Sequence, residues 1–384
     1  MFVKTFQKKS FLEKYWIPLN KNLKIAIIGS RGYPYVYSGY ETLVKDLSER
    51  LVIKGHKVRV YCHSPLFKKK PRFVNGIELV YTPSFETKFF SQIINSFFSF
   101  IHVCFSDIDV VFVVNSANGP FGILTKLFRK KTCINVDGLE WLRPKWKGLG
   151  SIYFKISSKL STVFFDKVIT DSHEMNKVYK EKFFKDSTVI AYGSTMTASW
   201  TNEVLERFNL KNNEFYLVVG RLVADNNSKL ILDGFIKSKT QKKIVVVGDV
   251  PYKDAFAEKI KSYKSDKIIF TGYIRYQSEL TALYTNCFGY IHGHEFGGTN
   301  PTMINALDLN CQVLALDTSF TREMLIGKKV VFFKKTIDSI VKAIRSFENN
   351  YISIQNSNIE YNIPVKYDWD YIAKKYIDTF NDVI

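Results

Sequence analysis

The sequence is poor in cysteine, with five in 384 residues. No two of them form a Cys-x-x-Cys pair, and they are scattered along the chain at Cys62, Cys104, Cys133, Cys287 and Cys311. Such scatter argues against both a disulfide framework and a tetrahedral zinc site. A reducing compartment fits this pattern best, so we expect a cytoplasmic location.

A long apolar run is also missing. The best candidate, "FFSQIINSFFSFIHVCF" at 89–105, contains Ser, Gln, Asn and His and falls short of the roughly 20 residues that a bilayer span needs. We predict a helix here, either buried or lying at an interface. Residues 1–23 lack the unbroken apolar stretch of a secretory signal. We interpret them as a basic, aromatic-rich segment that either packs as a helix or touches a membrane surface.

Motifs for dinucleotides and metals are missing as well. Gly29, Gly32 and Gly39 do not have the G-x-G-x-x-G spacing of a dinucleotide fold, which disfavours nicotinamide chemistry. "DID" at 107–109 opens an apolar run and "DWD" at 368–370 precedes a helical pattern, so we assign both a structural role rather than Mg²⁺ binding. We therefore expect no metal requirement.

Acidic residues are scarce in the first half of the chain. Residues 1–192 contain 31 Lys and Arg against 15 Asp and Glu, and so account for most of the net charge of +19. Basic residues alternate with aromatic ones at 67–72, 128–131 and 143–147. Such a face suits nucleic acid, anionic lipid headgroups or an acceptor that carries a pyrophosphate, and solvated lysines are the structural alternative. Because zinc fingers, basic zippers and RNP-type motifs are absent, we expect no nucleic acid partner.

The chain does contain a regular alternation of short apolar runs and longer amphipathic stretches. The apolar runs form two series, at 24–30, 57–63, 77–82, 109–115, 132–138, 167–172 and 187–193, and then at 214–222, 242–250, 266–273, 287–293 and 311–317. Short runs that alternate with helices predict parallel sheets covered on both faces. We expect an α/β protein with two doubly wound domains that face each other across a cleft, a hinge near 191–200, and a ligand site at the carboxyl ends of the strands.

The segment "HGHEFGGTNPTMIN" at 292–305 carries the clearest chemical signal. It joins an apolar run to a helix that Pro301 is suited to open. Gly297 and Gly298 allow a ligand to approach the backbone, and the helix start presents N–H groups and the positive end of the helix dipole. We therefore expect an anion here. His292 and His294 lie on one face of a strand end, but without a third ligand they do not predict zinc.

Several motifs follow one another in order: "IGSRGYP" and "YSGYET", then "NVDGLEWLRPKW", "VVGRLVADNNSKLILDGF", "FTGYI", "HGHEFGGTNPTMINAL" and "LALDTSFTREML". Over nearly its whole length from Lys24 the chain resembles bacterial rhamnosyltransferases related to glycosyltransferase family 4, of the capsule and cell-wall β-1,4-rhamnosyltransferase type. The "VDGLEW" and "GGTNP" stretches are the specific ones. The resemblance implies a GT-B fold and metal-independent, retaining transfer of L-rhamnose from dTDP-L-rhamnose to a lipid-diphosphate-linked saccharide.

The resemblance also implies how the chain is divided. Residues 24–195 would form an acceptor-binding Rossmann-like domain, and residues 196–368 a nucleotide-sugar-binding one. Residues 369–384 would form a helix that crosses back to the first domain. The enzyme would work as a peripheral protein at the anionic inner face of the cell membrane, with no cofactor besides its donor substrate.

On the donor side, the resemblance implies that Arg221 neutralises the departing diphosphate. Pairing of Arg221 with a structural carboxylate is the alternative. We place His294 near the donor sugar. The remaining implied donor contacts are Gly39, Gly272, Tyr273, Ile274, Gly297, Gly298, Thr299 and Asn300.

The chain departs from the family pattern at two places. Where relatives carry a lysine shortly after the arginine, this sequence has Asn226 or Asn227. The second Glu of the family's E-x7-E motif, expected to contact the donor ribose, aligns with Asn305, and the first aligns with Gly297 or with Glu295, which we count as a catalytic candidate. Asn305 can still donate and accept hydrogen bonds, but it brings no charge.

On the acceptor side, Asp137 falls where many relatives carry a histidine. We expect its carboxylate to orient the attacking hydroxyl or to stabilise positive charge on the sugar, with helix capping or packing as the alternative for Asp137 and Glu140. Tyr40 and Glu41, at the helix start after Gly39, complete the expected acceptor contacts together with Trp141. Trp141 can stack on sugar or lipid, or belong to the aromatic core.

Four other functions stay open on the sequence alone. The donor can be another nucleoside-diphosphate sugar. Asn305, in place of the usual Glu, also permits a non-catalytic sugar-nucleotide binder or an epimerase of the same architecture. The basic first half is the reason to keep a nucleic-acid-binding protein as the fourth.

Overall fold

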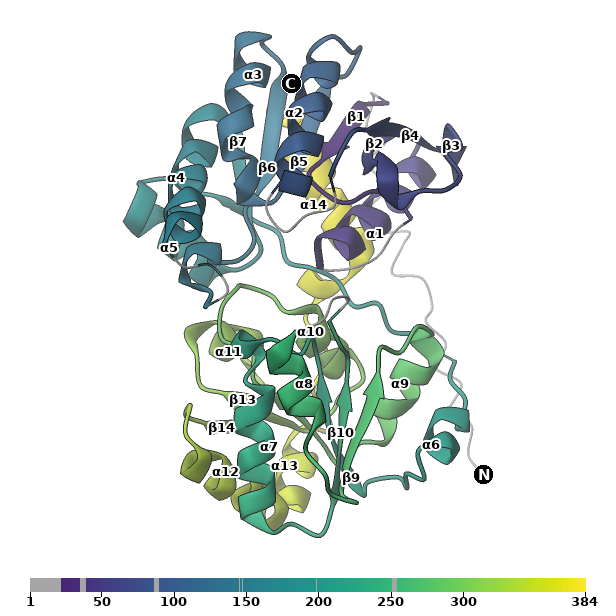
Figure 1. Cartoon of the computed structure of the whole chain (residues 1–384), viewed down its shortest axis with the longest axis vertical. Helices are drawn as coiled ribbons and strands as arrows, with labels where there is room; N and C mark the ends of the chain where they lie inside the picture. The colour runs from purple at the N-terminus through teal and green to yellow at the C-terminus, as the bar shows by residue number, and fades with distance from the viewer. Residues whose placement is uncertain are drawn as a thin grey trace.

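The structure is a computed structural model, and it describes residues 22–34, 39–85, 90–144, 146, 148–197, 199–250 and 254–384. Apart from its last two residues, the segment predicted at 1–23 lies outside the described residues. Figure 1 shows two α/β domains stacked along the long axis of the molecule. The first half of the chain builds one domain and most of the second half builds the other.

An eight-stranded sheet forms the centre of the first domain, in the order β3-β4-β2-β1-β5-β6-β7-β8. Neighbouring strands are parallel except for β3 and β4. The central strand β5 is buried along its whole length, as expected where helices cover both faces. The strands are β1 (Lys24–Ile28), β2 (Lys57–His63), β3 (Phe73–Val74), β4 (Ile77–Thr82), β5 (Val110–Val114), β6 (Lys131–Asn135), β7 (Lys167–Thr170) and β8 (Thr188–Val189).

Helices cover both faces of this sheet. Successive side chains of a strand point to opposite faces: Ile25 and Ile27 pack with α1, whereas Ala26 and Ile28 pack with α2 and α4. α5 begins after Ser172, whose hydroxyl accepts a hydrogen bond from a backbone N–H of the first turn. The helices are α1 (Gly39–Ile53), α2 (Phe90–Cys104), α3 (Gly122–Leu127), α4 (Leu149–Phe164) and α5 (His173–Phe183).

The second domain has a six-stranded sheet, entirely parallel, in the order β11-β10-β9-β12-β13-β14. Its strands are β9 (Phe215–Val219), β10 (Lys243–Val247), β11 (Ile268–Gly272), β12 (Gly289–His292), β13 (Val313–Leu316) and β14 (Val331–Phe333). The helices are α6 (Glu203–Arg207), α7 (Ser228–Ser238), α8 (Ala255–Lys261), α9 (Gln277–Asn286), α10 (Pro301–Asp308), α11 (Ser319–Met324), α12 (Ile337–Asn349) and α13 (Tyr351–Ser357).

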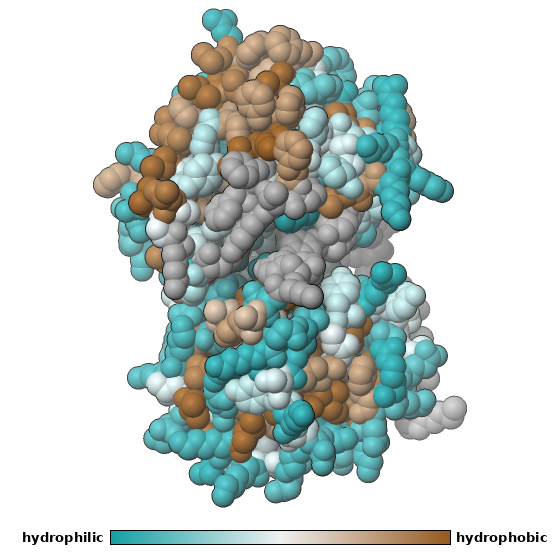
Figure 2. All heavy atoms as spheres, viewed as in Figure 1, coloured by the Kyte–Doolittle hydropathy of each residue, from teal (hydrophilic) through white to brown (hydrophobic). Residues whose placement is uncertain are grey.

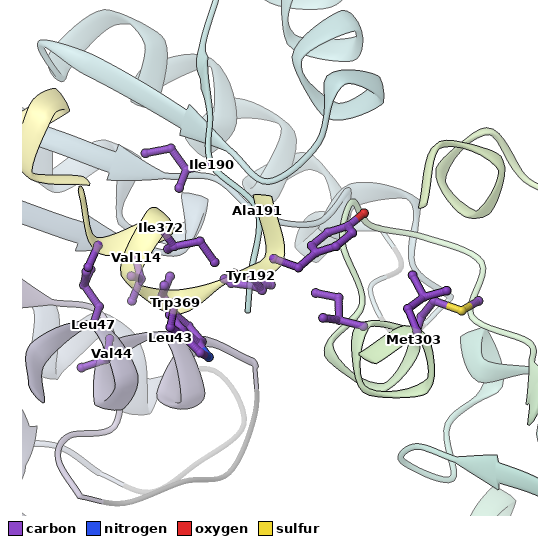
Figure 3. Packing of buried hydrophobic residues seen from close by; sticks show 14 of the residues in the cluster. Leu43, Val44, Leu47, Val114, Ile190, Ala191, Tyr192, Met303, Trp369 and Ile372 are labelled. Carbon is purple, nitrogen blue, oxygen red and sulfur yellow. The ribbon is translucent and has the colours of Figure 1, made fainter. Parts of the chain in front are cut away.

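The last helix, α14 (Trp369–Asn381), packs on the first domain. Tyr376 accepts a hydrogen bond from the side chain of Asn135 at 3.1 Å, and its ring lies 5.1 Å from that of Phe112. Figure 3 shows Trp369 and Ile372 next to α1. The two crossings between the domains run side by side, since the N–H of Ser194 donates to the carbonyl of Tyr367 at 3.2 Å.

The predicted fold class is confirmed: the protein is α/β with two Rossmann-like domains. The helix predicted at 89–105 is α2. None of the described helices combines the length and the apolar character needed to cross a membrane.

Candidate functional site

The candidate site lies where the loop between β12 and α10 of the second domain meets the ends of β6 and β7 of the first. Asn300 caps α10, because its side chain accepts a hydrogen bond from the N–H of Thr302 at 3.0 Å. The start of α1 is next to the start of α10: a Cβ on Gly39 would stand 3.8 Å from the ring of Pro301. Two helix N-termini, each with a positive dipole end, therefore meet here.

Two carboxyl groups extend from neighbouring strands of the first sheet. Asp137 follows β6 and Asp171 follows β7. Burial raises the pKa of Asp171 well above its usual range, and the adjacent Asp137 raises it further. Burial also raises the pKa of Asp137, although Tyr192 and Arg143 act in the opposite direction. Because two close, buried carboxylates do not both ionise, we infer that the pair holds one proton, mainly on Asp171.

Asp171 is also a contact between the domains. Its Oδ2 accepts hydrogen bonds from the N–H of Thr299 at 2.6 Å and from the Thr299 hydroxyl at 3.3 Å. A Cβ on Gly298 would lie 1.7 Å from Oδ1 of Asp171, so the carboxyl group fits only beside a glycine. The sequence predicts that Gly298 admits a diphosphate. In the structure the carboxyl group of Asp171 fills the space at its Cβ position, and the N–H of Gly298 is the group left for a ligand.

Gly297 lies where three side chains converge. Its φ of +126° favours glycine, and a Cβ there would stand 3.4 Å from Nε2 of His294, 3.8 Å from Nη2 of Arg143 and 3.9 Å from Oδ1 of Asp137. The backbone N–H groups of Gly297 and Gly298 donate to no other described residue. The N–H of Thr299, by contrast, is already bonded to Asp171.

Arg143 supplies a buried positive charge to this group. Its Nη1 lies 3.0 Å from Glu140, its Nε lies 3.8 Å from Asp225, and its Nη2 donates to the carbonyl of Phe296 at 3.5 Å. Burial lowers the pKa of Arg143, but Glu140, Asp225 and Asp137 outweigh it and hold that pKa above its usual value. Since Asp225 and Phe296 belong to the second domain, this guanidinium ties the two domains together.

His294 is held as a neutral imidazole. Burial, together with the positive charges of Arg143 and Arg221, lowers the pKa of His294 to about 3. Asn226 donates its Nδ2 to the carbonyl of Arg221 at 2.7 Å, so its Oδ1 is left to accept from Nδ1 of His294, also at 2.7 Å. Nε2 of His294 is then the unprotonated nitrogen. It lies on the side of Gly297, where it can accept a hydrogen bond.

Arg221 and Glu295 differ in their surroundings. Arg221 comes two residues after the end of β9 and is half-buried. Within the described part of the chain no carboxylate pairs with it, so the alternative of a structural partner has no support there. Glu295 instead pairs with Lys335 of the second domain at 2.6 Å.

Asn305 holds the hinge. Its side-chain oxygen accepts from the N–H of Thr195 at 3.1 Å, and it is buried. The hydroxyl of Ser194 lies 3.4 Å from the same oxygen and donates to Asp308 at 2.6 Å. The structure therefore gives Asn305 a role in fixing the interdomain segment, and the ribose contact expected from the sequence stays a prediction.

The residues expected on the acceptor side fall into different places. Tyr40 donates its hydroxyl to the backbone carbonyl of Asp137 at 2.7 Å. Glu41 accepts from the N–H of Arg31 at 3.1 Å, and so contacts the loop after β1. Trp141 is buried against Tyr179 and Phe183, so its ring is part of the core, not of an open stacking surface.

The predicted contacts at the end of β11 stand at the edge of the second sheet. Gly272 has a φ of +66°, and a Cβ there would meet no atom within 4 Å. Tyr273 is exposed, and Ile274 packs partly on the core. In the described part of the chain, no hydrogen bond joins these three residues to the group around Gly297.

Histidine-based metal binding is not favoured by the geometry. His292 is buried, and its Nδ1 lies 3.0 Å from the hydroxyl of Tyr290. Burial, followed by the neighbouring His294, lowers the pKa of His292 to about 3. Across the described residues, His, Cys, Asp and Glu form no group of three that could hold a metal ion.

Sequence reasoning missed three residues of the site. Arg143 lies within the "VDGLEWLRPKW" motif, but the sequence indicates it only as part of the basic cluster at 143–147. Asp171 ends the strand pattern at 167–172, and a carboxylate at the end of a parallel strand is the signal that could have found it. Tyr192, in the hinge, donates its hydroxyl to Oδ2 of Asp137 at 2.8 Å, and no pattern indicated it.

Two parts of the chain match known protein families. Residues 202–364 match the model described as glycosyl transferases group 1, and residues 91–195 match one described as a domain of unknown function (DUF1972). No curated protein has a sequence that matches the chain.

Solved structures match it over nearly its whole length. Sucrose-phosphate synthase from Thermosynechococcus elongatus has a TM-score of 0.78 at 13% identity, covering 93% of this chain and 98% of that one. Anabaena HepE in complex with UDP-glucose has a TM-score of 0.75 at 13% identity, covering 94% and 100%. The fold is GT-B. The catalytic domain of starch synthase IV from Arabidopsis thaliana, bound to ADP and acarbose, shares it with a TM-score of 0.64 at 12% identity, covering 94% and 99%. Together with the group 1 match, these GT-B neighbours support a glycosyltransferase.

Proposed function

We propose that the protein is a retaining glycosyltransferase that moves L-rhamnose from dTDP-L-rhamnose to a lipid-diphosphate-linked saccharide. It would act without a metal ion, at the anionic inner face of the cell membrane, during synthesis of a surface polysaccharide. The similar structures include complexes with UDP-glucose and with ADP. They support a nucleotide-sugar donor, and the choice of rhamnose rests on the sequence motifs.

The convergence at Gly297 is the observation that carries the proposal. His294, Arg143 and Asp137 all come within 4 Å of the place where a Cβ would stand. Arg221 adds a positive charge close enough to lower the pKa of His294. Cations and amide N–H groups in this small group can bind the diphosphate of such a donor, and the neutral imidazole can accept a hydrogen bond from its sugar.

Each group has a role in the transfer. The bond between the sugar's anomeric carbon and the donor phosphate oxygen breaks, and a bond to the acceptor hydroxyl oxygen forms on the same face. The leaving phosphate oxygen takes the proton of that hydroxyl, so no strong protein base is needed. Arg221 and the N–H groups of Gly297 and Gly298 stabilise the charge that grows on the diphosphate.

The first domain acts on the sugar and acceptor side. Asp137 keeps most of the negative charge of its pair with Asp171, and Tyr192 fixes its orientation. This carboxylate can stabilise positive charge on the sugar ring in the transition state. From the second domain, Nε2 of His294 can accept a hydrogen bond from a sugar hydroxyl, because the imidazole stays neutral.

A donor and acceptor panel tests the proposal. The protein would be incubated with dTDP-, UDP- and GDP-sugars, with and without lipid-diphosphate-linked saccharides, and the products followed by mass spectrometry. We expect a rhamnosylated lipid only when dTDP-L-rhamnose and an acceptor are both present. Consumption of donor alone would instead indicate an epimerase or hydrolase, and binding of donor without turnover would indicate a non-catalytic binder.

A further inference from the structure

One face of the first domain carries apolar side chains that point outward. Along α2 and just past its end, Ile93, Phe97, Ile101 and Phe105 recur every four residues and so form one stripe on the helix. Each of them is between 36% and 76% exposed. A surface helix of a soluble domain normally turns such a stripe toward the core.

The same face continues over α3 and α4. The ring of Phe105 lies 4.9 Å from that of Phe128, and α3 is in contact with both α2 and α4. Figure 2 shows apolar side chains gathered over the part of the first domain where Figure 1 shows α2, α3 and α4. The exposed apolar residues added by this part are Ile123, Leu127, Phe128, Leu149, Ile152, Ile156 and Val163. We refer to this surface, formed by α2, α3 and α4, as the α2–α4 face. Contiguous exposed apolar surface of this kind marks an interaction site.

The charged side chains on the helices of the α2–α4 face are all basic. α2, α3 and α4 contain no Asp or Glu. Exposed cations stand among the apolar side chains at Lys126, Arg129, Lys155 and Lys159. On α4, Lys155 and Lys159 lie three residues after Ile152 and Ile156, respectively, on the same side of the helix. An apolar surface with cations and no carboxylates is complementary to lipid chains beneath anionic headgroups.

We propose that the α2–α4 face docks the protein on an anionic lipid bilayer. The apolar side chains would enter the boundary between headgroups and acyl chains, and the Lys and Arg side chains would meet the lipid phosphates. The proposal rests on the proposed function for its lipid-linked acceptor, but docking itself needs neither donor nor acceptor.

The face also reaches the site. α4 begins at Leu149, and the hydroxyl of Ser151 donates to the carbonyl of Trp141 at 2.7 Å, beside Glu140 and Arg143. Leu149 is 84% exposed at this end of the helix. A saccharide whose lipid carrier stays in the bilayer would therefore arrive next to the residues that face Gly297.

Vesicle flotation with the full-length protein tests the docking surface. The vesicles would contain either phosphatidylcholine alone or equal parts of phosphatidylcholine and phosphatidylglycerol. We expect binding to the mixed vesicles that weakens with salt and with removal of phosphatidylglycerol. Ile152→Ser/Ile156→Ser should lower partitioning by at least about tenfold, and Lys155→Gln/Lys159→Gln by roughly twentyfold at low salt.

Matched changes on the second domain serve as controls. Ile352→Ser/Ile359→Ser and Lys264→Gln/Lys342→Gln remove similarly exposed side chains and should bind vesicles as the unaltered protein does. Circular dichroism and thermal unfolding would establish that each variant folds. If the unaltered protein stays off the vesicles, or if the α4 variants bind as tightly as it does, the proposal is wrong. A dimer that dissociates in Ile152→Ser/Ile156→Ser, without vesicle binding, would assign the face to a second copy of the chain.

Nucleotide titration separates this proposal from the proposed function. dTDP and UDP would be titrated calorimetrically in the absence of lipid. The α4 variants should bind nucleotide with unchanged affinity, because the altered side chains lie outside the group around Gly297. Vesicle binding without nucleotide binding would overturn the donor assignment alone, and nucleotide binding without vesicle binding would overturn the docking surface alone.

Discussion

Asp171 accepts a hydrogen bond from the backbone N–H of Thr299 at 2.6 Å, and so joins the end of β7 in the first domain to the loop before α10 in the second. Glu323 of α11 makes a second connection at the same place. Its two carboxylate oxygens accept from the N–H groups of His173 and Glu174, at 2.9 and 2.8 Å. At this place the second domain therefore contacts residues 171–174 of the first, a stretch that contains Asp171 of the carboxyl pair.

Two replacements of Asp171 distinguish the role of its negative charge from the role of its hydrogen bonds. Asp171→Asn keeps an oxygen for the N–H of Thr299 and places an amide donor toward Asp137, as the protonated carboxyl does. We expect it to retain most of the activity. Asp171→Ala loses both contacts and should lower kcat by roughly tenfold to hundredfold through misplacement of the two domains. It should also lower the free energy of unfolding by about 1–3 kcal/mol.

Steady-state kinetics and urea unfolding of the two variants check this. If Asp171→Asn is as inactive as Asp171→Ala, the ionised carboxylate is needed and our placement of the shared proton is wrong.

Arg221 is expected to act on the leaving diphosphate. Arg221→Ala should lower kcat/KM by about a hundredfold or more, because a fixed cation at a developing charge is worth several kcal/mol in a site shielded from water. Arg221→Lys should recover part of the loss. Arg345→Ala, an exposed arginine on α12, is the control and should leave both rate and unfolding temperature unchanged. A normal rate in Arg221→Ala, with donor in excess, would remove Arg221 from the mechanism.

Much of the fold follows from the sequence, for a physical reason. Parallel strands buried on both faces require continuous apolar runs, and runs such as 109–115 and 242–250 correspond to β5 and β10. The helix starts at Gly39 and Pro301 also follow from local chemistry. These features depend on neighbours along the chain, which a single sequence contains.

The detail of the site depends on contacts between distant residues. Gly298 suggested room for a ligand, but the space belongs to Asp171, 127 residues earlier in the chain. Trp141 suggested a stacking surface, but Tyr179 and Phe183 enclose it. A glycine or a tryptophan has the same local signature in either case, so only the packing of the folded chain decides between them.

Acidification is expected to destabilise the protein through its two buried histidines. Their pKa values are lowered to about 3 in the folded protein, from 6.5 for an ordinary histidine. As pH falls below about 6.5, the unfolded chain takes up protons that the folded protein does not. Each histidine should therefore lower the free energy of unfolding by up to about 1.4 kcal/mol per pH unit, down to the folded pKa.

Urea unfolding between pH 7.5 and 5 would measure this slope. His292→Gln and His294→Gln should each flatten it, since glutamine does not titrate. An unchanged slope in both variants would mean that the two imidazoles take up protons over the same pH range in the folded protein as in the unfolded chain, so that their pKa values are not lowered.

The close approach of Gly298 and Asp171 predicts a strong coupling between these two positions. Gly298→Ala alone places a Cβ 1.7 Å from Oδ1 of Asp171, so the carboxyl group must leave the loop and the bond to Thr299 must break. We expect a loss of about 2–4 kcal/mol in the free energy of unfolding and a large drop in activity.

In Asp171→Ala the space beside Gly298 is open, so adding Gly298→Ala should lower the free energy of unfolding much less. We expect a coupling energy of about 1–3 kcal/mol across the double-mutant cycle. Gly327→Ala is a control for adding a methyl group to the second domain, because no atom stands within 4 Å of its Cβ position. Its φ of +81° adds backbone strain that Gly298 does not have, so a larger loss in Gly298→Ala is due to the contact with Asp171. Additive effects of the two changes would show that the carboxyl group does not occupy the space beside Gly298.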